Sequence, residues 1–330
     1  MDEKTVSNIT SISVEGRSSI NAALSFAADP EQKARCLARL RMAQLGPENH
    51  PSECAAGGKH RFAEELGIPA VLAVVIDALC WLRQADNDIS ARDQALALIE
   101  AIPVAADLTA VPRSYAYWLL HDVQWGIAQY CPAGPLQGML PRIEALHAQE
   151  LTGKKMSEQA WKTLEQNARA EIEAAAASDE DQEYLASLLE CLTAPLHSMD
   201  SEQMGKLFGG AAYFAGERSK ALYWSRSEEL QLDALYDAFR AGFAPAPGPR
   251  PSAEHEAELA LWINREQALD AAWEQHMRQQ QAVLLTRWET WGDRQASLYA
   301  AFNAAAVEMI LLQFAQAPRR NVFAPAPQLH

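Results

Sequence analysis

The sequence contains none of the short motifs that identify a reaction. A GxSxG nucleophile elbow, an HExxH metal motif and a phosphate-binding P-loop are all absent. One glycine pair, Gly209-Gly210 in KLFGGAAYFAGE, lacks the lysine of a P-loop and has no strand pattern before it. It predicts a close approach of two helices, which glycine permits. These absences favour a protein that is not an enzyme and that binds no cofactor.

Cysteine is scarce and shows no pairing in the sequence. No two cysteines form a CxxC pair, which disfavours a zinc knuckle and a redox pair. We expect small buried residues in a reducing compartment. The N-terminal stretch MDEKTVSNITSISVEG also lacks the basic and apolar regions of a signal peptide, so we expect a cytoplasmic protein. The five cysteines are Cys36, Cys54, Cys80, Cys131 and Cys191.

Val, Ile and Thr are sparse, whereas alanine is abundant. Alanine loses no side-chain entropy in a helix, whereas β-branched residues do. No strand pattern of useful length occurs. The sequence therefore predicts an all-α protein, either a multi-helix bundle or a helical array.

Positive charge is also in short supply. The chain has 28 Lys and Arg against 43 Asp and Glu, a formal net charge of −15. Such a surface repels phosphate backbones, which disfavours direct binding of nucleic acid. The same field attracts basic partners and speeds their encounter, although many soluble proteins are simply acidic.

Long apolar runs are nearly absent. The most apolar one, Leu66–Leu82, is only marginally long enough to span a membrane and contains Pro69 and Asp77. We expect a buried helix that starts near Pro69, with no contact to a membrane.

Helix caps and proline positions divide the chain. Asp29 and Pro30 mark a helix start, and Ser90 and Ser157 are predicted N-caps. Residues 46–59 read as a loop, 100–112 as a helix-turn connector, and Tyr115–Tyr130 as a helix whose aromatic residues pack in the core. A helix over 141–150 is expected to stop near Gly153.

The stretch APAPGPRP, residues 244–251, is the clearest linker. Beyond it Ser252 is expected to cap a long helical segment, which Gly292 divides into two antiparallel helices. The predicted organisation is therefore a flexible lead (1–17), a helical domain (18–244), a C-terminal helical hairpin (252–317) and a loose tail (318–330).

One trio resembles a metal-binding half-motif. Glu144, His147 and Glu150 are spaced by three residues, which brings them near one helix face. A di-iron carboxylate site needs a second Glu-x-x-His and further glutamates, which the sequence lacks. A solvated helix face is therefore favoured, and a metal-dependent helical enzyme stays an alternative.

Two features are candidates for binding a protein partner. Four carboxylates within five residues form a turn that could meet an Arg/Lys cluster, although such a turn is usually just solvated. The C-terminal helices carry tryptophans, which favour interfaces when exposed. These partner-binding candidates are Asp179, Glu180, Asp181, Glu183, Trp262, Trp273, Trp288 and Trp291.

Three blocks of sequence together resemble a bacterial group. They are AIPVAADLTAVPRSYAYWLLHD, RIEALHAQELTGKKMSEQAWKTLEQNARAEIEAAA and AAYFAGERSKALYWSRSEELQLDALYDAF. The group is largely uncharacterised and all-helical, with an EAIPVGADL block before Ala/Trp/Arg-rich helical repeats; some members are labelled immunity proteins. The resemblance covers residues 66–245, and Ala105 stands where the group has glycine. It implies that 100–112 is a structural bend, and it carries over no catalytic residue.

The resemblance and the acidic surface favour an immunity-type protein. Such a protein would bind and neutralise a cognate bacterial toxin that acts in the cytoplasm, and its partner would be basic. The alternative in the class of binding proteins is a helical adaptor or chaperone for a secreted effector, with 252–317 as its docking hairpin.

Overall fold

The computed structural model describes residues 24–45, 49–57, 61–81, 90–131, 134–154, 156–176, 180–218, 220–243, 247–252 and 255–320. These residues form helices and no strand, and Ala106 and Arg319 form an isolated antiparallel bridge. The predicted all-α class is confirmed. The predicted lead, 1–17, lies outside the described residues.

The chain divides into two compact units. Unit 1 comprises Met1–Ala215 and Tyr299–His330, and unit 2 comprises Gly216–Leu298. The predicted boundary at 244–251 falls inside unit 2 instead, because helices on both sides of it share one core. Long helix α15 (Ala282–Gln316) begins in unit 2, and from Tyr299 it belongs to unit 1.

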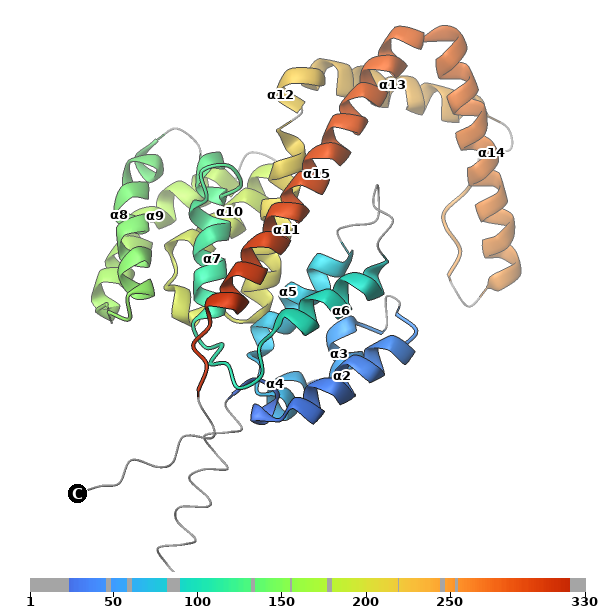
Figure 1. The fold of residues 1–330 in the computed structure, drawn as a ribbon. Coiled ribbons are helices and arrows are strands. Elements are labelled where there is room, and N and C mark those ends of the chain that lie inside the picture. Colours follow the sequence, from blue (N-terminus) through green and yellow to red (C-terminus); the bar gives the residue numbers. More distant parts are fainter. Residues whose placement is uncertain are drawn as a thin grey trace, which may run out of the picture. The chain divides into compact units, whose positions relative to one another are not determined.

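The helices of unit 1 form two neighbouring groups in sequence order (Figure 1). The first group is α2 (Pro30–Met42), α3 (Pro51–Ala56), α4 (Arg61–Leu66), α5 (Ala70–Trp81) and α6 (Ala91–Ala101). The second is α7 (Val111–His121), α8 (Pro135–Leu151), α9 (Glu158–Ala176), α10 (Glu180–Thr193) and α11 (Ser201–Glu217). The short 3-10 turn η1 (Ser25–Ala28) precedes α2, η2 (Ile127–Tyr130) lies between α7 and α8, and η3 (Leu196–Ser198) lies between α10 and α11.

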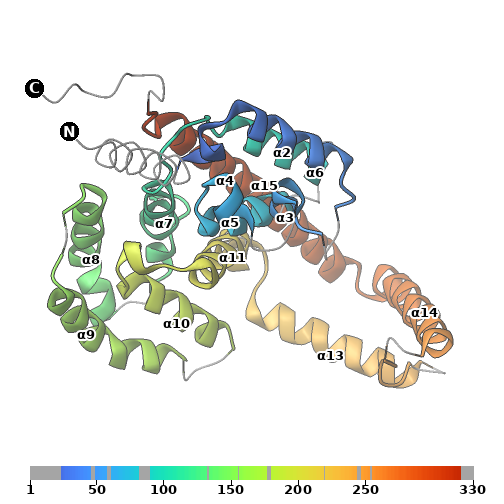
Figure 2. The same cartoon turned by 90° about the horizontal axis from the view of Figure 1, so that it is seen from below.

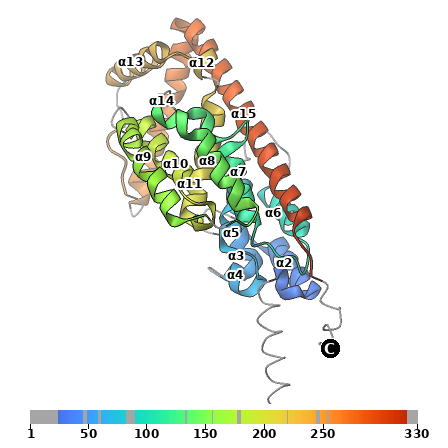
Figure 3. The same ribbon diagram turned by 90° about the vertical axis from the view of Figure 1, so that its left-hand side faces the viewer.

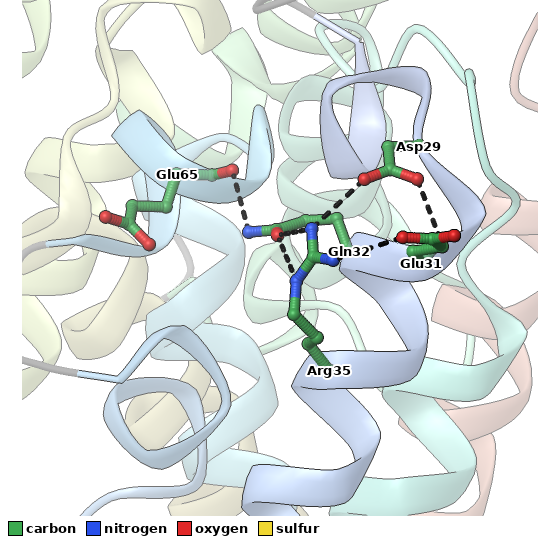
Figure 4. A network of polar contacts seen from close by, with 5 residues as sticks. All are labelled: Asp29, Glu31, Gln32, Arg35 and Glu65. Atoms are coloured by element: carbon green, nitrogen blue, oxygen red, sulfur yellow. Dashed lines mark hydrogen bonds and ion pairs between the residues drawn. The ribbon is translucent and has the colours of Figure 1, made fainter.

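The start of α2 is fixed by its own polar residues. Asp29 is the N-cap and accepts from the Glu31 amide at 2.8 Å, while Pro30 occupies the first turn, as predicted. Arg35 reaches back to Asp29 at 3.1 Å and to Gln32 at 2.7 Å (Figure 4). Figure 2 shows α2 beside α6, and the two helices are in contact.

The predicted loop over 46–59 is wrong in part, because it contains helix α3. Pro51 suits the first turn of that helix, and Gly57 ends it with φ +79°. Asp77 of α5 caps the helix from outside, accepting from the Ser52 amide at 2.9 Å and the Ser52 hydroxyl at 2.6 Å. Burial raises the pKa of Asp77, and the bonds from Ser52 oppose that rise.

Helix α5 is the buried helix that the apolar run predicts. Its Leu72, Val75, Ile76 and Leu79 are fully buried, which confirms the predicted stripe. Among the described helices, α15 is the one that is long and apolar enough to cross a membrane by length and composition, and α5 is too short. The second half of α15 buries one face in unit 1.

That buried face of α15 is a stripe spaced by four residues. Phe302, Ala306, Ile310 and Phe314 are all fully buried. Around Phe302, aromatic rings from two other parts of unit 1 form one cluster. Its ring-centroid distances to neighbours are 6.0 Å to Trp118, 5.8 Å to Trp125 and 5.6 Å to Phe208.

Helix α7 differs from the prediction at both ends. It starts at Val111, because Pro112 fits its first turn, and it ends at His121. Asp122 ends it by accepting the amides of Gln124 and Trp125, each at 2.9 Å. Most of the aromatic cluster is core, as predicted, since Tyr115 and Trp118 are buried.

The connector between α6 and α7 joins three distant parts of unit 1. Ser25 exchanges backbone hydrogen bonds with it: its amide donates to the Ala106 carbonyl at 3.0 Å, and its carbonyl accepts from Ala105 at 3.2 Å. The buried Ser25 hydroxyl also donates to the Pro103 carbonyl and accepts from the Ala106 amide. On the other side, the Asp107 amide donates to the Pro318 carbonyl at 2.8 Å.

The junction has a further hydrogen bond, from the Arg320 amide to the Ala105 carbonyl at 3.1 Å. Residues 318–320 of the predicted loose tail are therefore bonded to the connector, and 321–330 lie outside the described residues. Ala105 has φ +60°, a left-handed conformation that an L side chain rarely adopts. The neighbouring Ala106 is fully buried and has no positive φ.

The two alanines of the junction give a paired prediction. Ala105→Gly relieves left-handed strain of about 1–2 kcal/mol and loses a methyl group worth about 0.8 kcal/mol, so we expect the free energy of unfolding to change by less than about 1 kcal/mol. Ala106→Gly relieves no strain and should lower it by about 1–2 kcal/mol. Urea unfolding followed by circular dichroism measures both; an equal loss in the two variants would contradict the strain at Ala105.

Unit 2 is built from α12 (Lys220–Tyr223), α13 (Arg226–Gly242), α14 (Glu256–Gln280) and the first part of α15. Ser225 and Glu228 form a reciprocal capping box at the start of α13. His255, not the predicted Ser252, is the N-cap of α14. The predicted division at Gly292 is also wrong: the chain turns at Gln281, and Gly292 lies within α15.

Helices α14 and α15 diverge from the turn at Gln281 (Figure 1). In unit 2 their shared core residues, Met277, Leu284 and Leu285, lie beside this turn, so a hairpin packed along its whole length is not found. The core of unit 2 also takes Trp224 from the segment before α13, which is why residues on both sides of 244–251 belong together. Its buried members are Trp224, Met277, Leu284 and Leu285, with Leu232, Leu235, Trp273 and Trp291 packed against them.

Candidate functional site

An apolar groove lies in unit 2, where α13, α14 and the start of α15 meet. Its volume is about 380 Å³. Five of its lining residues are apolar and three are carboxylates. The apolar ones are Leu232, Trp273, Met277, Leu285 and Trp288; the carboxylates are Asp270, Glu274 and Glu289.

Aromatic neighbours hold one wall of the groove in place. The ring of Trp273 lies 5.3 Å from Tyr236 and 5.4 Å from Phe239, both on α13, and it stacks on His276. On the opposite helix Trp288 is 44% exposed. A tryptophan left this exposed beside a hollow is a ready anchor for a partner side chain.

The rim of the groove is acidic. Asp270 and Glu289 make no hydrogen bond or ion pair with any residue that the structure describes. Glu274 is paired with Arg278 one turn along α14, so its charge is partly offset. The rim therefore carries net negative charge around an apolar floor.

The structure separates the four predicted tryptophans. Trp273 and Trp288 line the groove, whereas Trp262 and Trp291 do not. The Trp262 indole donates to the Gly248 carbonyl at 2.8 Å and lies under the Arg250 guanidinium. Trp291 stacks on Trp224 with ring centroids 6.0 Å apart. These two rings pack against other parts of unit 2, away from the groove.

The predicted acidic turn is the start of a helix. Asp179 lies outside the described residues, and Glu180, Asp181 and Glu183 belong to the first turn of α10. Acidic residues suit this place because the helix macrodipole is positive at its N-terminus. Their role in partner binding stays a prediction.

The Glu144, His147 and Glu150 trio is used by the fold. His147 and Glu150 are buried, so the predicted solvated face is wrong for these two. Both Glu150 oxygens are bonded, one to the Leu196 amide and one to His197, each at 2.7 Å. No cluster of three potential metal ligands occurs in the described part of the chain.

The hydrogen bonds of His147 determine the tautomers of two histidines. Its Nε2 lies 2.8 Å from the Ala194 carbonyl, which can only accept, so Nε2 carries the proton. The neutral ring then accepts at Nδ1, and the bond there comes from His121 Nε2 at 2.7 Å. Burial lowers the pKa of both histidines to about 4, so both rings are neutral at pH 7.

A larger hollow in unit 1 is lined by side chains of both charges, which do not favour one class of ligand. It measures about 480 Å³ and is lined by residues of α9, α10 and α11. Figure 3 shows these three helices near one another. The charges of the hollow are mixed, with Glu165, Arg169, Glu190 and Lys206 among the lining residues. Burial raises the pKa of the lining Cys191 thiol to about 11, which leaves it un-ionised at neutral pH. The predicted helix approach at Gly210 is confirmed beside it: a Cβ there would lie 2.3 Å from Leu188.

Several groove residues escaped the sequence analysis. Nothing in the local sequence distinguishes Leu232 and Met277 from other apolar helix positions, or Asp270 and Glu289 from other helix carboxylates. The usable signal was the repeat of apolar and acidic residues beside Trp273 and Trp288, since helix neighbours are spaced by three or four. The turn at Gln281, which brings α15 against α14, had no such signal.

Comparison with protein families, with curated proteins and with solved structures gives no match.

The two neutral histidines predict a pH dependence of stability. Their pKa is about 4 in the folded protein and about 6.5 when unfolded, so the unfolded state binds more protons between these values. The contribution of the two neutral histidines to the free energy of unfolding is therefore fully present above pH 6.5. It falls as the pH drops toward 4, by about 1.4 kcal/mol per pH unit for each histidine that titrates. Urea unfolding across this range should show the slope.

His147→Gln removes one titrating group and should reduce that slope. His255→Gln changes an exposed histidine in unit 2 and should leave the slope as it is in the wild-type protein. If His147→Gln had the wild-type slope, the buried pair would not be the cause.

Proposed function

We propose that this protein is a binding protein whose groove in unit 2 takes a basic, amphipathic segment of a partner protein. The observation that carries the proposal is the pairing of an apolar floor with an acidic rim. An apolar side of the segment fits Trp273, Met277 and Trp288, and its Lys or Arg side chains meet Asp270 and Glu289.

The two parts of the groove would contribute differently. Burying exposed tryptophan surface supplies affinity, because large aromatic side chains dominate interface energies. The rim charges select a basic segment and speed its approach, and so does the net charge of −15. Association should therefore slow as salt increases, since the Debye length is about 10 Å at 0.1 M salt.

Among binding roles, we favour an immunity-type protein that neutralises a toxin acting in the cytoplasm. The sequence resemblance supports this role, and the acidic groove suits a toxin with a basic surface. A toxin that acts on nucleic acid or nucleotides often needs such a surface for its own substrate. Covering that surface would block the toxin.

The chemistry of the groove can be tested with a synthetic helix. The probe carries Leu and Trp on one face and Lys on the other, and its binding is followed by fluorescence anisotropy. Trp288→Ala should weaken binding about tenfold or more, and Asp270→Lys should slow association. The matched controls are Trp262→Ala and Glu258→Lys, which change a tryptophan and a carboxylate on α14 away from the groove.

A second peptide, with Glu in place of Lys, should bind far more weakly. Equal binding of the two peptides, or equal losses in Trp288→Ala and Trp262→Ala, would contradict the groove as the site.

The immunity role needs a separate test in cells. We expect the product of the open reading frame beside this gene to arrest growth, and co-expression of the wild-type protein to restore it. Trp288→Ala combined with Asp270→Lys should reduce the rescue, while Trp262→Ala should keep it. Growth arrest that the wild-type protein does not relieve would contradict the immunity role. That result would not bear on peptide binding in the groove, which the anisotropy experiment tests separately.

A further inference from the structure

A small cavity in unit 1 gathers positive charge in an acidic protein. It measures about 290 Å³ and is lined by Arg113, Glu150, Gly153, Lys154 and His197. Three of these five residues are basic, although the chain as a whole has a net charge of −15. They come from three separate elements: the start of α7, the end of α8 and η3.

The end of α8 holds Lys154 at this cavity. The Lys154 amide donates to the Gln149 carbonyl at 3.2 Å, and the Gly153 amide donates to the Glu150 carbonyl at 3.0 Å. This pair of bonds is the Schellman motif, which needs a left-handed residue, and Gly153 has φ +78°. The Lys154 side chain is exposed and makes no ion pair with any residue in the described ranges.

A buried carboxylate orients the second basic residue. Glu150 is only 4% exposed, and its Oε1 accepts from His197 Nδ1 at 2.7 Å. Its Oε2 accepts from the Leu196 amide at 2.7 Å, so both oxygens are occupied. Nδ1 therefore carries a proton, and Nε2 is left without a partner among the described residues.

The third basic residue, Arg113, lies in the first turn of α7. This is an unfavourable place for a cation, because the helix macrodipole is positive there. Arg113 is half-buried and forms no hydrogen bond or ion pair within the described part of the chain. An anion in the cavity would satisfy Arg113 and would also interact favourably with the helix start.

We propose that this cavity binds the phosphate group of a phosphate monoester. The Arg113 guanidinium and the Lys154 ammonium supply N–H donors and two positive charges, which match the double charge of a phosphate monoester. His197 Nε2 donates to a third oxygen of the phosphate when that nitrogen carries a proton. A carboxylate offers two oxygens and one charge, and so would leave one of the three groups unused. The site is in unit 1 and is independent of the groove in unit 2.

The test is isothermal titration calorimetry on the full chain with phenyl phosphate and with benzoate. These probes share a ring and differ in the anionic group. We expect phenyl phosphate to bind at least tenfold more tightly than benzoate, with inorganic phosphate competing. A phosphoserine peptide in the same assay distinguishes a modified side chain from a small molecule as the source of the phosphate.

Three variants complete the test. Arg113→Gln and Lys154→Gln should each weaken phenyl phosphate binding about tenfold, with an unchanged melting temperature. Arg142→Gln removes the same charge from an exposed site on α8 outside the cavity and should bind as the wild-type protein does. The proposal would be overturned if benzoate bound as tightly as phenyl phosphate, or if Arg142→Gln lost as much affinity as the cavity variants. It would also be overturned if no binding were seen at about 10 mM probe, which corresponds to a binding free energy of about −2.7 kcal/mol.

Discussion

Unit 1 depends on the hydrogen bonds of the connector between α6 and α7. Residues 103–107 lie outside the helices, so their buried backbone groups need hydrogen-bond partners from other segments. Ser25 supplies them from one side and residues 318–320 supply them from the other. The connector thus fixes where α2, α7 and the second half of α15 lie within this unit. Its strained residue, Ala105, is tolerated because bonds on both sides hold it, and a glycine there would carry no strain.

The polar residues of unit 1 serve two different ends. His121 and His147 are neutral and bonded to each other and to the backbone, and a metal ion would have to break those bonds to bind His147. Glu150, one helical turn further along α8, is bonded as fully, yet it holds His197 at the wall of a cavity. The same trio that resembles a metal motif in the sequence thus contributes to the fold through one residue and to a proposed anion site through another.

Local signals predicted some helix starts correctly, although the signals at Ser252 and Gly292 did not match the structure. Asp29, Pro30 and Ser90 mark helix starts in the sequence and in the structure, because caps act within one turn. Contacts between distant residues left no such signal. The turn at Gln281 lacks glycine and proline, and the proline-rich stretch 244–251 does not divide the units, since Trp224 and Met277 share a core across it. The groove could be predicted only as far as its tryptophans, because its shape depends on that turn.

The division of the chain bears on the order in which the protein folds during synthesis. Unit 2 is continuous in sequence, so its core can form as soon as residues 216–298 have left the ribosome. Unit 1 is interrupted by it and must wait for Phe302 to cover Trp118 and Phe208, and for residues 318–320 to reach the connector. Until then a large aromatic surface stays open to water. A nascent chain stalled before Phe302 would therefore be a natural substrate for chaperones that bind exposed apolar side chains.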